Sequence, residues 1–289
     1  MFHVETKGKN FSNKELKDNQ SIYSGSGVDI IYNKKLGLAK TVFRKDKRLK
    51  ENFSSSEYLP HTKRKFTLVS LLYSFVRVLM LAYKHNMIQK IISKKSKILD
   101  FGSGTGDFLL YMKRKNHQVY GVEPNKAARE ISSKNGIIPF ENLKQLGGTK
   151  FNTITLWHVL EHLQDPSKAI KSFHKMLDKE GVLIVAVPNL ESHDALHYKN
   201  FWAALDIPRH LWHFTSKGLL KIVKQNGFSV VKVFPLWFDT LYISYLSERN
   251  RSKKFALIRG VFKGIYFNLK SFKTKKYSSL TFVFRKSSP

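Results

Sequence analysis

The chain has 289 residues, enough for one or two domains with a substantial core. Hydrophobic residues make up 42% and aromatic residues 13%, which excludes a wholly disordered or fibrous protein. There is no cysteine, so disulfide scaffolds, thiolate metal sites and cysteine nucleophiles are excluded too.

The net charge of +30 comes from 51 basic and 21 acidic residues and is unevenly spread. Residues 1–97 carry +14, residues 98–228 carry +5 and residues 229–289 carry +11. Basic flanks suit nucleic acid or an anionic membrane, although biased composition explains them equally well. Peripheral membrane contact and nucleic acid therefore stay open as partners, with nucleic acid the less favoured, and the sequence leaves the oligomeric state open.

The first 95 residues are expected to form an N-terminal extension with a helical cap. Residues 1–65 are polar and basic, and Gly25 and Gly27 indicate loops. The N-terminus lacks the apolar core of a signal peptide, so a cytoplasmic protein is expected. The segment 56–61 is a candidate lid.

An apolar stretch, residues 68–83, is interrupted by Ser70, Ser74 and Arg77. It falls short of the roughly 20 apolar residues of a membrane span, and its polar positions form one narrow helical stripe. A helix buried against the rest of the protein is favoured, and a membrane-surface helix is the alternative.

From Ser96 onward, strand and helix patterns alternate, which predicts a doubly wound α/β domain over residues 96–289. Helices are expected after a glycine-rich turn at 102–106, over 125–135, from Asp165-Pro166 to Gly181, and through 219–223. A basic, partly helical insert is expected at about 239–275. The expected strands are 97–101, 119–122, 137–140, 151–157, 182–187, 229–234 and 280–284.

The most informative segment is Asp100-Phe101-Gly102-Ser103-Gly104-Thr105-Gly106-Asp107, between a strand and a helix. Glycine lets a ligand approach the backbone closely. A dinucleotide fingerprint needs glycine or alanine where Asp107 stands, and a Walker loop needs a lysine that is absent. The two carboxylates would also repel phosphates. Glu123, which ends the next strand, can accept both ribose hydroxyls of an adenosine. An adenosine that carries a cationic group instead of phosphates indicates S-adenosyl-L-methionine.

Four segments, 98–107, 121–124, 156–162 and 187–189, together resemble the class I S-adenosylmethionine-dependent methyltransferases. They are most similar to the broad bacterial group that includes ubiquinone-biosynthesis-type O-methyltransferases. The resemblance covers roughly residues 96–234 and the last strand. It implies a Rossmann-like sheet of seven strands with the last one antiparallel, and methyl transfer to an unidentified small-molecule or lipid-like acceptor.

The resemblance also implies roles for individual residues. The glycine loop would line the methionine part of the cofactor, Glu123 would bind the ribose, and the adenine would lie beside Glu141, Asn142 or Leu143. Trp157 and His158 would lie beside the sulfonium. The expected cofactor-binding residues are Asp100, Gly102, Ser103, Gly104, Gly106, Glu123, Pro124, Asn142, Trp157 and His158.

The acceptor is expected on the long connection 190–214, because long loops at the carboxyl ends of parallel strands are usually functional. Methyl transfer by in-line displacement depends mainly on positioning, and a base adds a modest factor. His158 is the first candidate base or orienting group and His210 the second. In the alternative, 190–214 is a packed lid with a salt bridge and core aromatics. The expected substrate-binding residues are Trp202, Asp206, Arg209, His210 and His213.

Three other functions compete with this interpretation. His158, Glu161 and His162 match the H-x-x-E-H pattern of inverted zinc peptidases. That site needs a helix around the pair and a third ligand, so a zinc hydrolase is disfavoured and no metal is expected. An RNA methyltransferase that uses the basic flanks, or a non-catalytic S-adenosylmethionine-binding protein, stays open.

Overall fold

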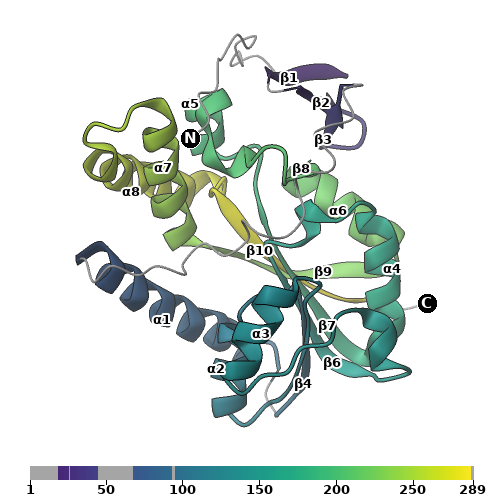
Figure 1. Cartoon of the computed structure of the whole chain (residues 1–289). Coiled ribbons are helices and arrows are strands. Elements are labelled where there is room, and N and C mark those ends of the chain that lie inside the picture. Colours follow the sequence, from purple (N-terminus) through teal and green to yellow (C-terminus); the bar gives the residue numbers. More distant parts are fainter. Residues whose placement is uncertain (1–18, 26, 45–67, 93–94, 288–289) are drawn as a thin grey trace. The chain divides into compact units, whose positions relative to one another are not determined.

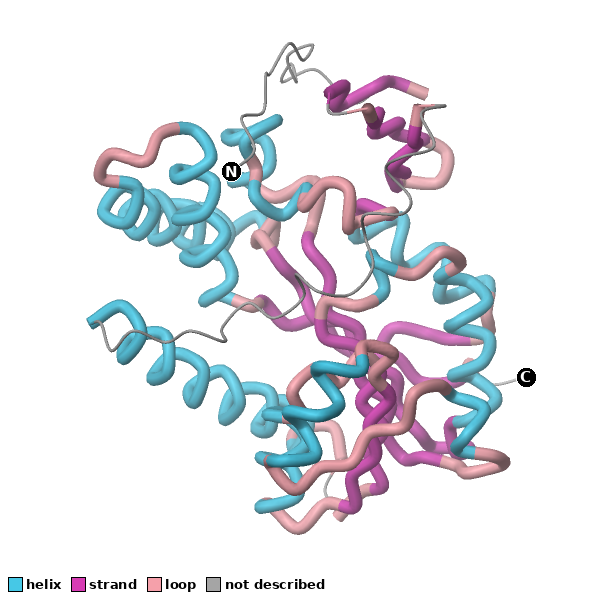
Figure 2. Tube along the Cα trace, viewed as in Figure 1, coloured by secondary structure: helices cyan, strands magenta, loops and turns pink. Residues whose placement is uncertain are grey.

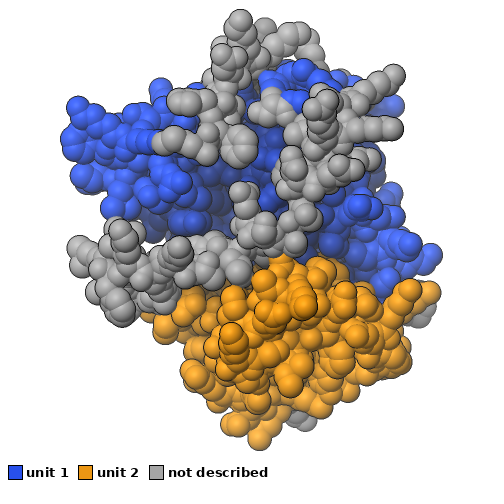
Figure 3. Space-filling view, viewed as in Figure 1, with its two compact units in different colours: residues 1–53, 158–174, 185–289 blue, residues 54–157, 175–184 orange. Residues whose placement is uncertain are grey.

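The computed structural model describes residues 19–25, 27–44, 68–92 and 95–287. The candidate lid at 56–61 lies outside them. The chain forms two compact units (Figure 3). One comprises residues 54–157 and 175–184, and the other comprises residues 1–53, 158–174 and 185–289. The expected division at residue 95 into an extension and a methyltransferase domain stays a prediction.

The main sheet has six strands in the order β5-β4-β6-β7-β10-β9 (Figure 1). Strand β4 runs parallel to β5 and β6, and β10 runs antiparallel to β9. The Rossmann-like α/β fold with an antiparallel edge is therefore confirmed. The strands are β4 (Lys97–Phe101), β5 (Gln118–Val122), β6 (Phe151–Trp157), β7 (Leu177–Pro188), β9 (Phe228–Pro235) and β10 (Ser279–Lys286).

The expected strand at 137–140 is not formed, so the described sheet has six strands and not seven. Only Phe140 pairs with β5, through a single parallel bridge to Val122. Pro139 directly before it has no N–H to donate to a ladder. The segment therefore contacts the sheet edge at one residue.

The glycine loop lies in the unit of residues 54–157 and 175–184, with helices α1 (Leu68–Gln89), α2 (Asp107–Arg114) and α3 (Lys126–Lys134). The side chain of Asn125 accepts a hydrogen bond from the Ala128 N–H and so caps α3. Among the α1 side chains that the structure describes, from residue 76 onward, Met87 and Ile88 are buried and Val78 is 55% exposed, so the expected burial is seen near the C-terminal end of the helix. Among the described helices, none has the length and apolarity that a membrane crossing requires.

The other unit contains a second sheet, which the sequence analysis missed. Strands β1 (Gln20–Gly25), β2 (Val28–Asn33), β3 (Leu38–Phe43) and β8 (Trp212–Phe214) pair antiparallel in that order. Gly25 ends β1 and Gly27, at φ 74°, turns the chain into β2, so these glycines mark a hairpin and not open loops.

The connection 190–214 is mostly regular (Figure 2). It contains α5 (His193–Tyr198), two 3₁₀ turns at Lys199–Phe201 and Ala203–Leu205, and β8. The unit also holds α6 (Ser216–Gln225), α7 (Trp237–Arg251) and α8 (Ala256–Thr274), the last two within the expected insert.

Helix α4 (Pro166–Met176) begins as expected, with proline first and the Asp165 carboxylate accepting the Lys168 N–H at 2.9 Å. Its expected end at Gly181 is wrong, because the chain enters β7 at Leu177 and Gly181 is a buried strand residue.

Candidate functional site

Asp100 is the most perturbed group beside the glycine loop. It lies on β4, is 2% exposed, and accepts a hydrogen bond from the Thr155 hydroxyl at 2.6 Å. Burial raises the pKa of Asp100 to about 7, with a smaller contribution from Glu123, against the opposing effects of Thr155 and Lys84. Thr155, which the sequence analysis missed, is a fully buried polar residue of β6 (Phe151–Trp157).

The surroundings of the loop glycines differ, and so does the reason why each position favours glycine. Gly102, Gly104 and Gly106 have φ values of 76°, 54° and 79°. A Cβ atom on Gly106 would collide with Ser132 of α3, so packing alone requires that glycine. A Cβ atom on Gly104 would meet no atom within 4 Å. The loop therefore has an open side at Gly104, where a ligand can approach the backbone.

The carboxylate of Glu123, 3% exposed, accepts the N–H of Gly104 and the N–H of Asn125, both at 2.8 Å. It thereby fixes the loop conformation, a role that the sequence analysis did not predict. Each carboxylate oxygen has a further lone pair, so the expected contact with ribose hydroxyls stays a prediction. Pro124, also expected at the cofactor, is exposed and offers no polar hydrogen.

Asn142, the expected adenine neighbour, is exposed and caps the 3₁₀ turn Leu143–Leu146. Its carboxamide oxygen accepts the Lys144 N–H at 3.1 Å, so local structure accounts for this residue. Its contact with adenine stays a prediction.

Two buried donors at this site lack a hydrogen-bond partner among the described residues. They are the Ser103 hydroxyl and the indole Nε1 of Trp157. The Trp157 ring packs against Phe108, with 5.4 Å between centroids, and lies 4.2 Å from the Lys84 Nζ. Together with the Asp100 carboxylate and the open side of Gly104, these groups fit a ligand that has both cationic and hydrogen-bonding parts, as S-adenosylmethionine has.

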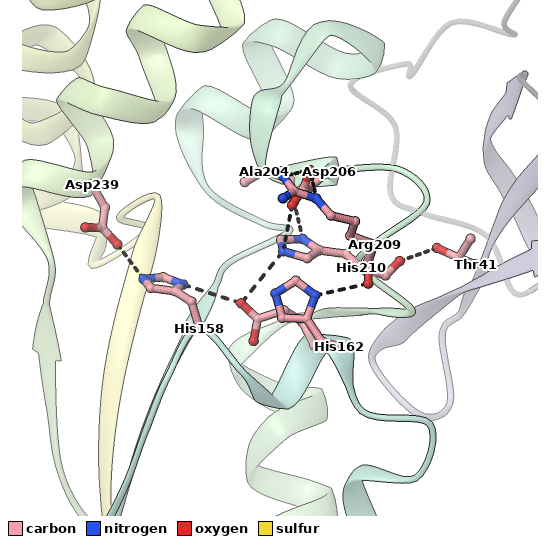
Figure 4. A network of polar contacts seen from close by, with 9 residues as sticks. Thr41, His158, His162, Ala204, Asp206, Arg209, His210 and Asp239 are labelled. Carbon is pink, nitrogen blue, oxygen red and sulfur yellow. Dashed lines mark hydrogen bonds and ion pairs between the residues drawn. The ribbon is translucent and has the colours of Figure 1, made fainter. Parts of the chain in front are cut away.

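His158 lies in the other unit, in the left-handed region at φ 56° (Figure 4). Its Nε2 lies 2.8 Å from Asp239 Oδ2 on α7, and its Nδ1 lies 3.4 Å from Glu161 Oε1. Burial alone would lower the pKa of His158, but Asp239 and Glu161 raise it to about 10. A protonated imidazole accepts no proton, so the raised pKa favours the orienting role of His158 over that of a base, and both roles stay predictions. No local signal identified Asp239, which lies 81 positions further along the chain.

Glu161, His162 and His210 form a cluster beside His158 (Figure 4). His162 Nδ1 lies 3.0 Å from the Arg209 carbonyl and His210 Nδ1 lies 2.9 Å from the Ala204 carbonyl. Their ligand atoms all lie within 4.8 Å of one another, so this cluster could hold a metal ion, and the expectation of no metal stays a prediction. The zinc peptidase pattern fails locally, because the helix at Leu160–His162 has three residues and does not include His158.

Three of the expected substrate-binding residues match the packed-lid alternative. Trp202 is 2% exposed and donates from Nε1 to Asp194 Oδ2 at 2.7 Å. The Arg209 guanidinium pairs with the Asp206 carboxylate at 2.6 Å. The Trp202 indole belongs to the core, as the packed-lid alternative expects, and its contact with an acceptor stays a prediction.

Both buried histidines of this segment are uncharged at neutral pH. Burial lowers the pKa of His213 to about 3, and its Nε2 lies 3.0 Å from the Thr41 hydroxyl of β3. Burial also lowers the pKa of His210, against the opposing effects of Glu161 and Asp206. His213 therefore connects β8 to β3, while His210 keeps the protonation state that a base requires.

A small pocket lies beside Trp202, His210 and His213. It has essentially no room for a water molecule, whereas ordinary small-molecule sites enclose ~300–1,000 Å³. An acceptor could enter only after side chains move. The pocket is lined by Pro188, Leu190, Trp202, Ala204, His210, Trp212, His213 and Phe214.

Comparisons with known proteins agree with the geometry. A family model described as a methyltransferase domain matches residues 72–233. An uncharacterized methyltransferase of Oceanobacillus iheyensis is 29% identical over 122 residues, covering 39% of this chain and 56% of that protein. A ubiquinone biosynthesis O-methyltransferase of Actinobacillus pleuropneumoniae is 32% identical over 107 residues, covering 32% of this chain and 46% of that protein. The match to the first curated relatives thus spans about half of their length.

Among solved structures, a putative sarcosine dimethylglycine methyltransferase from Galdieria sulphuraria superposes with a TM-score of 0.50. The match covers 74% of this chain and 86% of that one at 14% identity. At this identity the likeness concerns the fold alone.

Proposed function

Because this chain belongs to the methyltransferase domain family and carries a class I S-adenosylmethionine-dependent domain, we propose that the whole protein methylates a small-molecule or lipid-like acceptor. The open side of the loop at Gly104 is the observation that carries the proposal, because it leaves room for a ligand against the backbone. The buried Asp100 carboxylate and the donors on Ser103 and Trp157 surround the same loop with complementary groups.

S-adenosylmethionine, when bound, supplies a methyl group on a positively charged sulfur, so the protein needs mainly to position its acceptor. His158 is about one third exposed, and Asp239 and Glu161 raise its pKa, so the role proposed for it is to orient an acceptor and not to take its proton. His210 is neutral and is the candidate to receive that proton. The likeness to a ubiquinone biosynthesis O-methyltransferase supports an oxygen acceptor as the first class to test.

Calorimetry with S-adenosylmethionine and its demethylated product tests the cofactor site. We expect binding without added nucleotide, and we expect Glu123→Ala to weaken it more than about tenfold by removing charge-assisted hydrogen bonds. Glu130→Ala, at an exposed carboxylate on α3, is the matched control and should bind normally. Because Glu123 also fixes the loop, the nearly isosteric Glu123→Gln variant is measured as well, and thermal unfolding of both variants tests whether the loss of binding comes from a loss of structure.

No binding at millimolar cofactor, or equal binding by the Glu123 variants, would refute the proposed site. If the cofactor binds, the acceptor can be identified by incubating the purified protein with isotope-labelled cofactor and cell extract. Mass spectrometry then detects the labelled product.

A further inference from the structure

Helix α8, which packs beside α7 (Figure 1), exposes its large apolar side chains. Phe262, Leu269 and Phe272 are each 70% exposed, and Ile258 is 56% exposed. With Ile265, at 46%, they follow a spacing of three and four residues, so they form one continuous stripe along the helix. We name these five side chains the α8 stripe.

The opposite face of α8 is buried and made mostly of small residues. A Cβ atom on Gly260 would collide with the backbone of Tyr245, and one on Gly264 would approach Leu241 at 2.8 Å. This close packing fixes the rotation of α8 about its axis. The α8 stripe cannot turn inward without forcing large side chains into the space that the glycines keep clear.

The surroundings of the α8 stripe are strongly basic. The segment 249–276 contains ten lysines and arginines and no acidic residue. Two of them, Arg259 and Lys263, pair with Glu248 at 2.7 and 2.9 Å. Lys270 and Lys273 are exposed on α8 itself. A continuous exposed apolar stripe with a cationic border is the pattern of a helix that lies in a membrane interface.

We propose that the α8 stripe docks onto an anionic lipid bilayer, with the lysines of α8 and the adjoining loops contacting the lipid headgroups. Anionic lipid complements both parts of the surface, since acyl chains cover the aromatic and aliphatic side chains and phosphates attract the lysines. A second copy of this chain would bring the same positive charge against itself, and a nucleic acid would leave the α8 stripe in water. The docking does not depend on methyl transfer.

Co-sedimentation of the full chain with vesicles tests the proposal. We expect binding to vesicles of phosphatidylcholine with 30% phosphatidylglycerol, and at least about tenfold weaker binding to pure phosphatidylcholine. The triple variant F262Q/L269Q/F272Q should lose about tenfold or more of the binding to anionic vesicles, because each substitution removes an exposed apolar group. Ile138→Gln, at an 82% exposed position in the other unit, is the matched control and should bind normally.

A second variant, K270E/K273E, keeps the α8 stripe and should weaken binding to anionic vesicles while leaving the residual binding to phosphatidylcholine unchanged. Thermal unfolding confirms that both variants are folded. The proposal is overturned if the unmodified protein fails to sediment with anionic vesicles, or if the triple variant binds as well as it does. A dimer in solution that the triple variant dissociates would also overturn it, and would assign the α8 stripe to a second copy.

Discussion

Replacing Asp100 by asparagine should separate cofactor binding from stability. With a pKa of about 7, the buried carboxylate is ionised to about one tenth at pH 6 and nine tenths at pH 8. If the ionised form is the one that holds the cationic amine of S-adenosylmethionine, the contribution of Asp100 to the association constant rises about tenfold across this range. Asparagine has no such dependence.

The assay is calorimetric titration of both proteins at pH 6, 7 and 8. The amine of the cofactor itself titrates near pH 8, so the quantity to compare is the ratio of the two association constants, in which that effect cancels. We expect the ratio of unmodified protein to Asp100→Asn to rise about tenfold. Glu130→Gln, at an exposed position on α3, serves as the control and should keep a constant ratio. A ratio that does not change with pH would refute the assignment of Asp100 to the cofactor amine.

Asp100→Asn should bind the cofactor more weakly but should be more stable to unfolding than the unmodified protein at pH 8. A carboxyl with a raised pKa in the folded state stabilises the protein fully below its unfolded pKa near 4, and this contribution is lost as the pH rises to about 7. Asp100→Asn has no charge to bury, so it should unfold at a higher temperature than the unmodified protein at pH 8. A substitution that raises stability but weakens cofactor binding is the result expected when the replaced residue serves function at the expense of stability.

Two further predictions concern the loop and the charged histidine. Gly104→Ala and Gly136→Ala each place a Cβ atom in open space at positive φ, so each should cost about 1–2 kcal/mol of stability, but only Gly104→Ala should weaken cofactor binding in calorimetry. Equal affinities for the two variants would place the ligand elsewhere. Asp239→Asn should lower the pKa of His158, measured by NMR titration of the ring, and the His158 signal should stay that of the charged form at pH 8 only in the unmodified protein. Because the pKa of His158 is raised in the folded state, its contribution to stability is complete below about pH 6.5 and is lost as the pH approaches 10. The free energy of unfolding in urea should therefore fall more steeply between these pH values in the unmodified protein than in Asp239→Asn.

Local sequence signals predicted the strands around the glycine loop well. The bounds of β4 and β6 are those expected, because each is a short run rich in apolar and β-branched residues bordered by polar or glycine-rich segments. The hairpin β1–β2 also has a signal, since the buried residues Val28, Ile30 and Tyr32 alternate with half-buried positions behind a glycine turn. Its partner β8 has only three residues, too few for any periodic pattern to be recognised.

The candidate site was harder to predict where its chemistry depends on distant residues. Asp239 on α7 raises the pKa of His158, and Trp202 is buried in a cluster whose members range from Ile22 to Phe267 in the sequence. Residue type alone therefore left two roles open at each position: base or orienting group at 158, and acceptor contact or core aromatic at 202. The three-dimensional contacts favour the second role at both.

The pairing of β3 with β8 has a consequence for how the protein is made. The hydroxyl of Thr215, directly after β8, donates to the carbonyl of Gly37, 178 positions earlier. At about 5–20 residues per second, β8 is synthesised roughly 10–35 seconds after β3, and the edge of β3 stays unpaired during that interval. An unpaired strand edge is a template for other nascent chains. Lys40 is exposed in β3 opposite Trp212. A charged lysine on a strand edge disfavours pairing with other chains, so we expect Lys40 to reduce such pairing before β8 is synthesised.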